Sequence, residues 1–268
     1  MISRFERAMN YLVLAIFASS ILLPLLNIAQ AAFAPPPGGG TGGMRWGNFA
    51  EAWVEARFDR YLANSLLVTL TVLAISLVVS IMAGYALGTM RFRGAQTLFY
   101  LFLLGIMVPA EAIVIPLFFD LRALGLTDSL FAVAMPQAAM STAFGTYWMR
   151  TYFRSSNRAI AEAAKLDGAG PLRALWSVQL PVARPAIVTL TVLVFMWTWN
   201  EFLIPLIMSP TGKMRTMPQG LAFFQGQHTT DEALLAAAAV MVALPVVIVY
   251  LFLQRHFIRG MLEGAVKD

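Results

Sequence analysis

The sequence contains no cysteine and little charge of either sign. The absence of cysteine excludes disulfide frameworks, thiolate zinc sites and cysteine nucleophiles. Charged residues make up only 12% of the 268 residues and hydrophobic residues 59%, whereas a soluble domain carries about 25% charged residues. A chain this apolar does not stay disordered in water either. The composition therefore indicates an integral membrane protein.

Motifs for catalysis and nucleotide binding are also missing. The two histidines, His228 and His256, are not part of an H-E-x-x-H sequence, and no G-x-x-x-x-G-K-[ST] sequence occurs. We therefore expect no catalytic residue, no metal site and no bound cofactor in this chain, so that any energy from ATP comes from another polypeptide. The net charge of +5 indicates basic loops that set membrane topology and no nucleic-acid partner.

Six stretches are long and apolar enough to cross a membrane. A helix that crosses about 30 Å of hydrocarbon needs about 20 largely uncharged residues. The third and fifth of these stretches each contain one charged residue, Glu111 and Glu201. We predict an all-α integral membrane protein with six transmembrane helices, at residues 11–33, 61–90, 95–119, 129–149, 185–208 and 234–253.

The distribution of basic residues predicts the orientation. Thirteen of the 19 lysines and arginines lie on the side that also holds both termini, and six of these lie in the connection 150–184. Because basic loops stay in the cytoplasm, both termini are predicted to be cytoplasmic, and the Pro/Gly-rich stretch 34–43 external. The first span also resembles a secretory signal with an A-x-A site at 29–31, but its apolar run is long for a signal, which favours a retained helix.

The connection 150–184 between the fourth and fifth spans has helical content of its own. Gly168 and Gly170 end a first amphipathic helix, and Pro171 suits the first turn of a second one. We predict a helix-turn-helix hairpin in the cytoplasm. A hairpin lying on lipid headgroups is the alternative, and binding to DNA is disfavoured because spans adjoin both ends. The second helix is predicted to carry one continuous stripe of Leu172, Leu175, Trp176 and Gln179.

The hairpin suits mechanical coupling to a cytoplasmic partner. A transporter driven by cytoplasmic ATP must convert movement of soluble subunits into tilting of membrane helices, and this hairpin joins two spans directly. The small Ala163 and Ala164 permit close approach of a partner, Glu162 can pair with a cation, and Gly168 allows the turn.

The sequence from Glu162 to Gly168, E-A-A-K-L-D-G, followed by Leu180 and Pro181, resembles the "EAA" loop of ATP-binding cassette importer permeases. The resemblance covers about residues 60–268 and is to the carbohydrate branch, in particular the second six-helix permease of maltose and glycerol-3-phosphate importers. Further residues that carry it are Tyr85, 91–94, Pro109, Pro116, 125–128, 199–202, 254–255, Gly260 and 264–267.

This resemblance implies a set of sites and partners. The partners are a second permease in a heterodimer, two ATPase subunits that bind ATP and Mg, an extracytoplasmic solute-binding protein or lipoprotein, and membrane lipid. The location is a bacterial or archaeal cytoplasmic membrane. The solute is a carbohydrate, or alternatively glycerol-3-phosphate or a related polyol phosphate. The residues expected to contact the ATPases are Glu162, Ala163, Ala164, Asp167, Gly168, Leu180 and Pro181 of the hairpin and Gly264, Ala265 and Lys267 of the C-terminal tail.

The expected organisation has three parts. Residues 1–59 form the first span and the external loop, 60–256 the core permease domain with its coupling loop 150–184, and 257–268 a cytoplasmic tail.

Polar residues inside the spans are candidates for the solute path. A charged side chain at a helix centre costs about 2.5–3.5 kcal/mol, so Glu111 and Glu201 need water, a partner or a ligand. With Asn200 they could line a water-filled path, or hold helices together by hydrogen bonds. The two carboxylates also keep a proton-coupled secondary carrier open as an alternative from another class. The prolines at 109 and 116 permit kinks.

Two further patterns in the spans indicate packing. Gly84 and Gly88 have the G-x-x-x-G spacing of closely packed helices. Trp197 and Trp199 favour packing or an interfacial position over stacking on a sugar.

Overall fold

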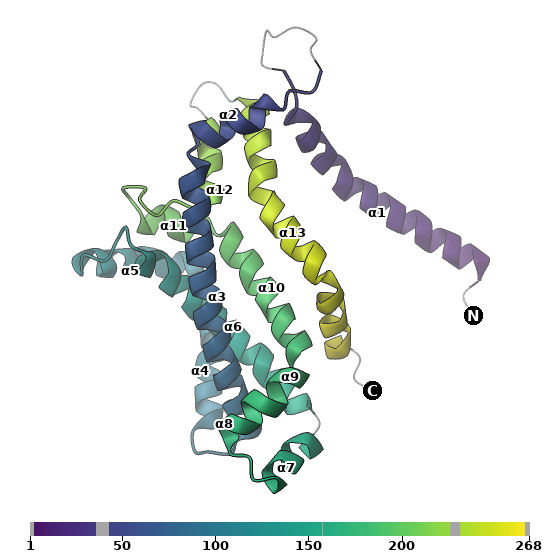
Figure 1. The fold of residues 1–268 in the computed structure, drawn as a ribbon, viewed down its shortest axis with the longest axis vertical. Coiled ribbons are helices and arrows are strands. Elements are labelled where there is room, and N and C mark those ends of the chain that lie inside the picture. The colour runs from purple at the N-terminus through teal and green to yellow at the C-terminus, as the bar shows by residue number, and fades with distance from the viewer. Residues whose placement is uncertain (1–2, 36–42, 157, 226–230, 266–268) are drawn as a thin grey trace. The chain divides into compact units, whose positions relative to one another are not determined.

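The computed structural model describes residues 3–35, 43–156, 158–225 and 231–265, and its secondary-structure elements in these ranges are all helical (Figure 1). The all-α prediction is confirmed. The elements are α1 (Arg4–Ala31), α2 (Gly47–Glu55), α3 (Phe58–Thr89), α4 (Ala95–Met107), α5 (Ala110–Ala123), α6 (Leu130–Ser155), α7 (Arg158–Leu166), α8 (Pro171–Ala174), η1 (Leu175–Gln179), α9 (Leu180–Val182), α10 (Arg184–Asn200), α11 (Leu203–Met208), α12 (Met217–Gly220), η2 (Leu221–Phe224) and α13 (Glu232–Ala265).

The chain divides into two compact units. The first comprises Met1–Arg60 and Gln219–Pro245, and the second Tyr61–Pro218 and Val246–Asp268. In the first unit Asn48 of α2 donates two hydrogen bonds from Nδ2, to the carbonyl oxygens of Ala32 at 3.0 Å and Ala34 at 2.9 Å. These bonds tie α2 to the end of α1. Most of the predicted external loop 34–43 lies outside the described residues.

Several helices have the length and composition of membrane spans. Among the described residues, α1, α3 and residues Glu232–Gln254 of α13 are each long and apolar enough to cross a membrane. Two further segments qualify only as bent pairs, α4 with α5 and Pro171–Val182 with α10. The 26 residues of α6 extend about 39 Å, although α6 is less apolar than α3. The structure supports a multi-pass membrane protein, and the count of six spans and the orientation of the termini stay predictions.

Two predicted spans are interrupted. The span predicted at 95–119 bends by 95° between α4 and α5, because Pro109 is extended (φ −68°, ψ 139°) and serves as the N-cap of α5. A proline lacks an N–H and keeps the residue before it out of the helical region. The span predicted at 185–208 ends its first helix at Asn200, and α11 starts at Leu203. Pro116, in contrast, lies inside α5 without ending it.

Helix α6 forms the centre of the second unit, where α4, α10 and α11 pack against it. Helix α3 also meets α6, through its two glycines. A Cβ built on Gly84 would lie 2.5 Å from Cβ of Met149, and one built on Gly88 would lie 3.1 Å from Cβ of Phe153. The predicted close packing at the G-x-x-x-G sequence is therefore confirmed, and the core of this unit depends on the absence of those side-chain atoms.

Candidate functional site

The predicted hairpin is present as α7 followed by α8, η1 and α9, and these elements gather at one end of the second unit (Figure 1). Gly168 follows α7 with φ +76°, and the N–H of Ala169 donates to the carbonyl oxygen of Ala164 at 2.9 Å. This is the Schellman arrangement, in which a left-handed residue after the helix lets the chain turn back. The glycine predicted to make the turn therefore makes it.

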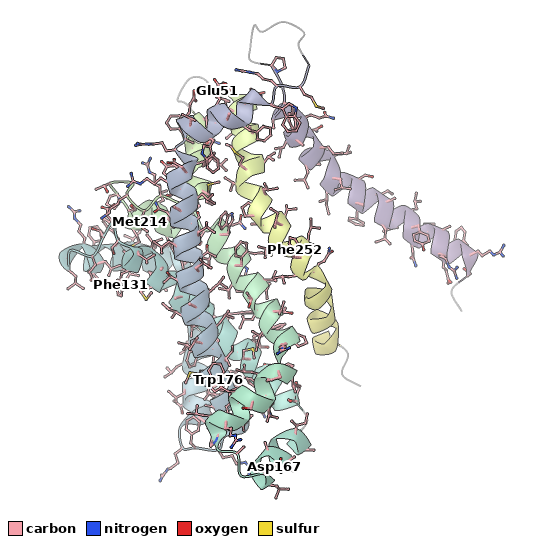
Figure 2. The ribbon with its side chains drawn as sticks, viewed as in Figure 1. Glu51, Phe131, Asp167, Trp176, Met214 and Phe252 are labelled. Carbon is pink, nitrogen blue, oxygen red and sulfur yellow. The ribbon has the colours of Figure 1, made fainter. Side chains whose placement is uncertain are left out.

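The residues expected to contact an ATPase differ in their exposure. Glu162, Ala163, Asp167 and Pro181 are exposed, and Figure 2 labels Asp167 at the turn that follows α7. Ala164, however, is only 6% exposed, since α7 packs against η1. Ala164 therefore serves the internal packing of the hairpin, and the contact of both alanines with an ATPase stays a prediction. Leu180 is half-buried beside the core.

The predicted single stripe of the second helix is also wrong. Leu175 and Gln179 are buried, whereas Leu172 and Trp176 are 64% and 60% exposed. The π-helical turn at η1, which is followed by Leu180 and then Pro181, separates the two pairs onto different faces. Leu166, at the end of α7, is exposed as well. The hairpin therefore has three exposed apolar side chains, those of Leu166, Leu172 and Trp176.

Arg150 anchors the base of the hairpin. Its side chain is largely buried, its Nε donates to the carbonyl oxygen of Leu87 at 3.3 Å, and its Nη2 donates to Oε1 of Gln96 at 3.4 Å. The guanidinium carbon lies 3.5 Å from the ring centroid of Phe99, a cation–π geometry. The sequence predicts only that Arg150 is one of the basic residues that set the membrane topology. In the structure, Arg150 joins α6 to α3 and α4 just before the hairpin begins.

A groove of about 980 Å³ lies beside the hairpin. It is lined by the end of α3, the connection to α4, the end of α6 and parts of the hairpin, including Arg91, Arg154, Glu162 and Pro171. Movement of the hairpin would change the shape of this groove. The groove thus connects the hairpin with the ends of the long helices α3 and α6.

Glu201 has a structural role at the break in the predicted fifth span. Its Oε1 accepts hydrogen bonds from the backbone N–H groups of Leu203 at 2.9 Å and Ile204 at 3.0 Å. A carboxylate that satisfies the free N–H groups at the start of a helix stabilises that helix. Glu201 therefore caps α11, which is a local role that differs from both the solute-path role and the interhelical hydrogen bond considered for it. Its part in a solute path stays a prediction. Asn200 donates from Nδ2 to the carbonyl oxygen of Met196 at 2.8 Å, within its own helix.

Asn200 and Glu201 also line a cavity of about 660 Å³ formed by α4, α6, α10 and the break before α11. Glu111 does not line it; its side chain is exposed in the first turn of α5. The structure thus brings together two of the three predicted path residues. The residues that line the cavity are Gly105, Ile106, Gln137, Met140, Ser141, Phe144, Leu193, Met196, Trp197, Thr198, Asn200, Glu201 and Ile204.

The sequence did not single out Gln137 and Thr198, which line the same cavity. Each is buried and has an oxygen without a hydrogen-bond partner among the described residues, Oε1 of Gln137 and Oγ1 of Thr198. A polar group buried in this way costs about 1–3 kcal/mol. The sequence signal that could have identified Gln137 and Thr198 is a polar residue within an apolar span.

The two tryptophans of α10 differ in their surroundings. Trp199 is buried and stacks on Phe195, whereas Trp197 is 47% exposed.

The C-terminal residues expected to reach an ATPase lie at the end of α13. Gly264 and Ala265 belong to the helix, and Lys267 lies outside the described residues. Their contact with an ATPase stays a prediction.

Asp128 joins two connections of the second unit. Its Oδ1 accepts hydrogen bonds from the Ser209 hydroxyl at 2.8 Å, the Thr211 hydroxyl at 2.7 Å and the Thr211 N–H at 3.1 Å. Burial opposes ionisation of Asp128, but the hydrogen bonds from Thr211 and Ser209 and the charge of Lys213 outweigh it, so its pKa lies below the usual value. Asp128 also has φ +57°, a conformation that aspartate and asparagine tolerate.

Replacing Asp128 by alanine is expected to reduce stability by about 1–3 kcal/mol, because three donors lose their acceptor and a left-handed residue is strained. Asp128→Asn keeps the backbone conformation and should cost less. A carboxylate with a lowered pKa stabilises the folded state above its unfolded pKa and ceases to do so as the pH falls through the folded pKa. The advantage of wild type over Asp128→Asn in thermal unfolding of the purified protein should therefore shrink below about pH 4. The exposed Asp120 on α5 supplies the control, and equal losses in Asp120→Ala would contradict the assignment.

Comparison with known proteins identifies relatives over most of the chain. Residues 76–263 match the family described as the binding-protein-dependent transport system inner membrane component. The chain is 28% identical to the diacetylchitobiose uptake system permease protein NgcG of Streptomyces coelicolor, over 97% of this chain and 89% of that protein. It is 31% identical to the arabinooligosaccharides transport system permease protein AraQ of Halalkalibacterium halodurans, over 94% of each.

A solved structure is similar as well. One chain of a bacterial ABC transporter involved in the import of the acidic polysaccharide alginate superposes with a TM-score of 0.78 at 26% identity. The match covers 96% of this chain and 99% of that one.

Proposed function

Because this chain belongs to the family of binding-protein-dependent transport system inner membrane components, we propose that it is a permease subunit of an ATP-driven importer of carbohydrates. The two permease relatives described above are named for diacetylchitobiose and for arabinooligosaccharides. These names support a mono- or oligosaccharide as the solute over glycerol-3-phosphate or a polyol phosphate. As a transport component, the chain is not an enzyme, and ATP hydrolysis belongs to separate subunits.

The observation that carries the proposal is the hairpin from α7 to α9. It is joined covalently to α6 at one end and to α10 at the other, and its turn is fixed by Gly168. Its exposed side chains include the Glu162 carboxylate and the apolar Leu166 and Trp176. A hairpin of this kind can seat in a soluble subunit and transmit its movement to two membrane helices.

The proposed assembly contains a second permease as heterodimer partner, two ATPase subunits that hold ATP and Mg, and an extracytoplasmic solute-binding protein or lipoprotein. It lies in the cytoplasmic membrane of a bacterium or archaeon, in contact with lipid. ATP binding closes the ATPases, draws the hairpins together and opens the solute path to the outside. This chain forms half of that path.

A proton-coupled carrier is disfavoured by the positions of the two carboxylates. Glu201 accepts two backbone hydrogen bonds at the start of α11, and Glu111 lies outside the cavity that Glu201 lines. A proton relay needs carboxylates that face one path and exchange protons along it. These two do not share a path in the described part of the chain.

Uptake by the complete assembly in proteoliposomes tests the proposal. Labelled diacetylchitobiose, arabinotriose, an alginate trisaccharide and glycerol-3-phosphate serve as probes, with ATP inside and the solute-binding protein outside. We expect sugar uptake that requires internal ATP and the binding protein and that persists with an uncoupler. Uptake that continues without ATP and collapses with the uncoupler would establish a secondary carrier instead.

A further inference from the structure

We propose that this chain itself contacts the transported solute, and that its cavity between α4, α6 and α10 takes a neutral, hydroxyl-rich sugar unit. The inference rests on the proposed function, because it names the solute class of that importer. The cavity volume of about 660 Å³ lies within the range of about 300–1,000 Å³ found for small-molecule sites.

Two oxygen atoms in the cavity wall lack a hydrogen-bond partner among the described residues, which indicates a ligand site. Gln137 is 5% exposed and donates from Nε2 to the carbonyl oxygen of Val133 at 2.8 Å, which leaves its Oε1 without a partner. Thr198 is 6% exposed, and its Oγ1 also has no partner among the described residues. Buried polar atoms without partners are rare and need an explanation. A sugar hydroxyl both donates and accepts, so a small side-chain rotation could pair it with either atom.

The rest of the wall has the character of a sugar site. Trp197 is held edge-to-face by Phe144, with ring centroids 4.9 Å apart, and is still 47% exposed. An aromatic ring fixed by a neighbour offers a flat apolar face at little entropic cost, which suits the C–H face of a sugar ring. The exposed Asn200 adds an amide beside it. The packing or interfacial position predicted for both tryptophans therefore fits the buried Trp199, whereas Trp197 is assigned to contact with the solute.

The charge of the cavity narrows the solute class. Among the described residues that line the cavity, Glu201 is the one charged side chain, and none is lysine or arginine. A phosphate or a uronate would lose hydration here without gaining a cation, and it would be repelled by the carboxylate. The cavity is therefore suited to neutral sugars and unsuited to glycerol-3-phosphate or an acidic oligosaccharide.

The test replaces the two unpaired atoms by apolar groups of similar size. Gln137→Leu and Thr198→Val are introduced into the complete assembly, and initial uptake of the neutral probes diacetylchitobiose and arabinotriose is measured together with thermal unfolding. Thr146→Val is the matched control, since Thr146 is buried on α6 with an unpaired Oγ1 but does not line the cavity. Thr198→Val and Thr146→Val remove only an unpaired oxygen and should unfold at the wild-type temperature. Gln137→Leu also loses the hydrogen bond from Nε2 to the carbonyl oxygen of Val133 and should unfold at a slightly lower temperature, so its uptake is measured well below both transitions.

We expect uptake of the transported neutral sugar to fall roughly 3- to 10-fold in each cavity variant and to match wild type in Thr146→Val. Wild-type uptake in both cavity variants, or an equal loss in Thr146→Val, overturns the inference while leaving the proposed function intact. A lower unfolding temperature of Thr198→Val with a proportionate loss of uptake assigns the cavity residues to packing and also overturns it. Preferential uptake of glycerol-3-phosphate or the alginate trisaccharide by wild type overturns the argument from charge, and no uptake of any probe overturns the proposed function itself.

Discussion

Replacing Gly168 by valine is expected to lower uptake by at least about 10-fold while the protein still accumulates in the membrane. Gly168 has φ +76°, and a side chain in that conformation costs about 1–2 kcal/mol, with more for a β-branched residue. A shift of 1.4 kcal/mol changes an equilibrium tenfold. The variant hairpin would therefore lose the turn after α7 and the Ala169 to Ala164 hydrogen bond. Uptake and ATPase activity of the reconstituted assembly are measured together, and ATP hydrolysis should continue without transport.

Gly170 provides a matched control for Gly168. A Cβ would meet no atom within 4 Å at either glycine, but Gly170 has φ −66° and ψ 164°, which valine adopts readily before a proline. Gly170→Val should therefore transport as wild type does, and Gly168→Asn should recover part of the activity because asparagine tolerates the left-handed region. Equal losses in Gly168→Val and Gly170→Val would show that bulk at the hairpin surface matters, and that the turn does not.

The hairpin shows how far local sequence determines structure. Gly168 and Pro171 act through their own backbone restrictions, so the turn and the second helix start could be predicted from residue type alone. The burial of Ala164 and the separation of Leu175 from Trp176 could not, because they depend on how α7 meets a π-helical turn. A residue pattern analysed with the α-helical period places such side chains on the wrong face.

The cavity shows the complementary limit. Charge inside an apolar span is visible in any sequence, and it identifies Glu201, with the amide of Asn200 beside it. Gln137 and Thr198 are ordinary polar residues until the packing of α6 and α10 buries them without partners. Arg150 is similar, since its contact with Phe99 joins residues that are distant in sequence. The roles of Gln137, Thr198 and Arg150 depend on contacts between segments that are distant in sequence. Such contacts cannot be predicted from the spacing of residues along the chain.

Replacing Gly84 by alanine is expected to cause a large loss of assembled protein. The added Cβ would lie 2.5 Å from Cβ of Met149, 2.9 Å from the backbone nitrogen of Arg150 and 3.0 Å from the carbonyl carbon of Met149. Backbone atoms cannot rotate away as a flexible side chain can, so α3 and α6 must separate. Overpacking a filled core costs about 1–3 kcal/mol, and here it also disturbs Arg150. Thermal unfolding and the amount of protein in the membrane measure the effect.

A graded series separates this contact from a general intolerance of alanine for glycine. Gly88→Ala should be milder, since its Cβ would lie 3.1 Å from Cβ of Phe153 and 3.2 Å from the carbonyl oxygen of Arg150, distances that a shift of a few tenths of an ångström relieves. Gly170→Ala meets no atom within 4 Å and should match wild type. If Gly84→Ala were as stable as Gly170→Ala, α3 and α6 could not pack as closely as Met149 and Arg150 require, and the base of the hairpin would need a different anchor.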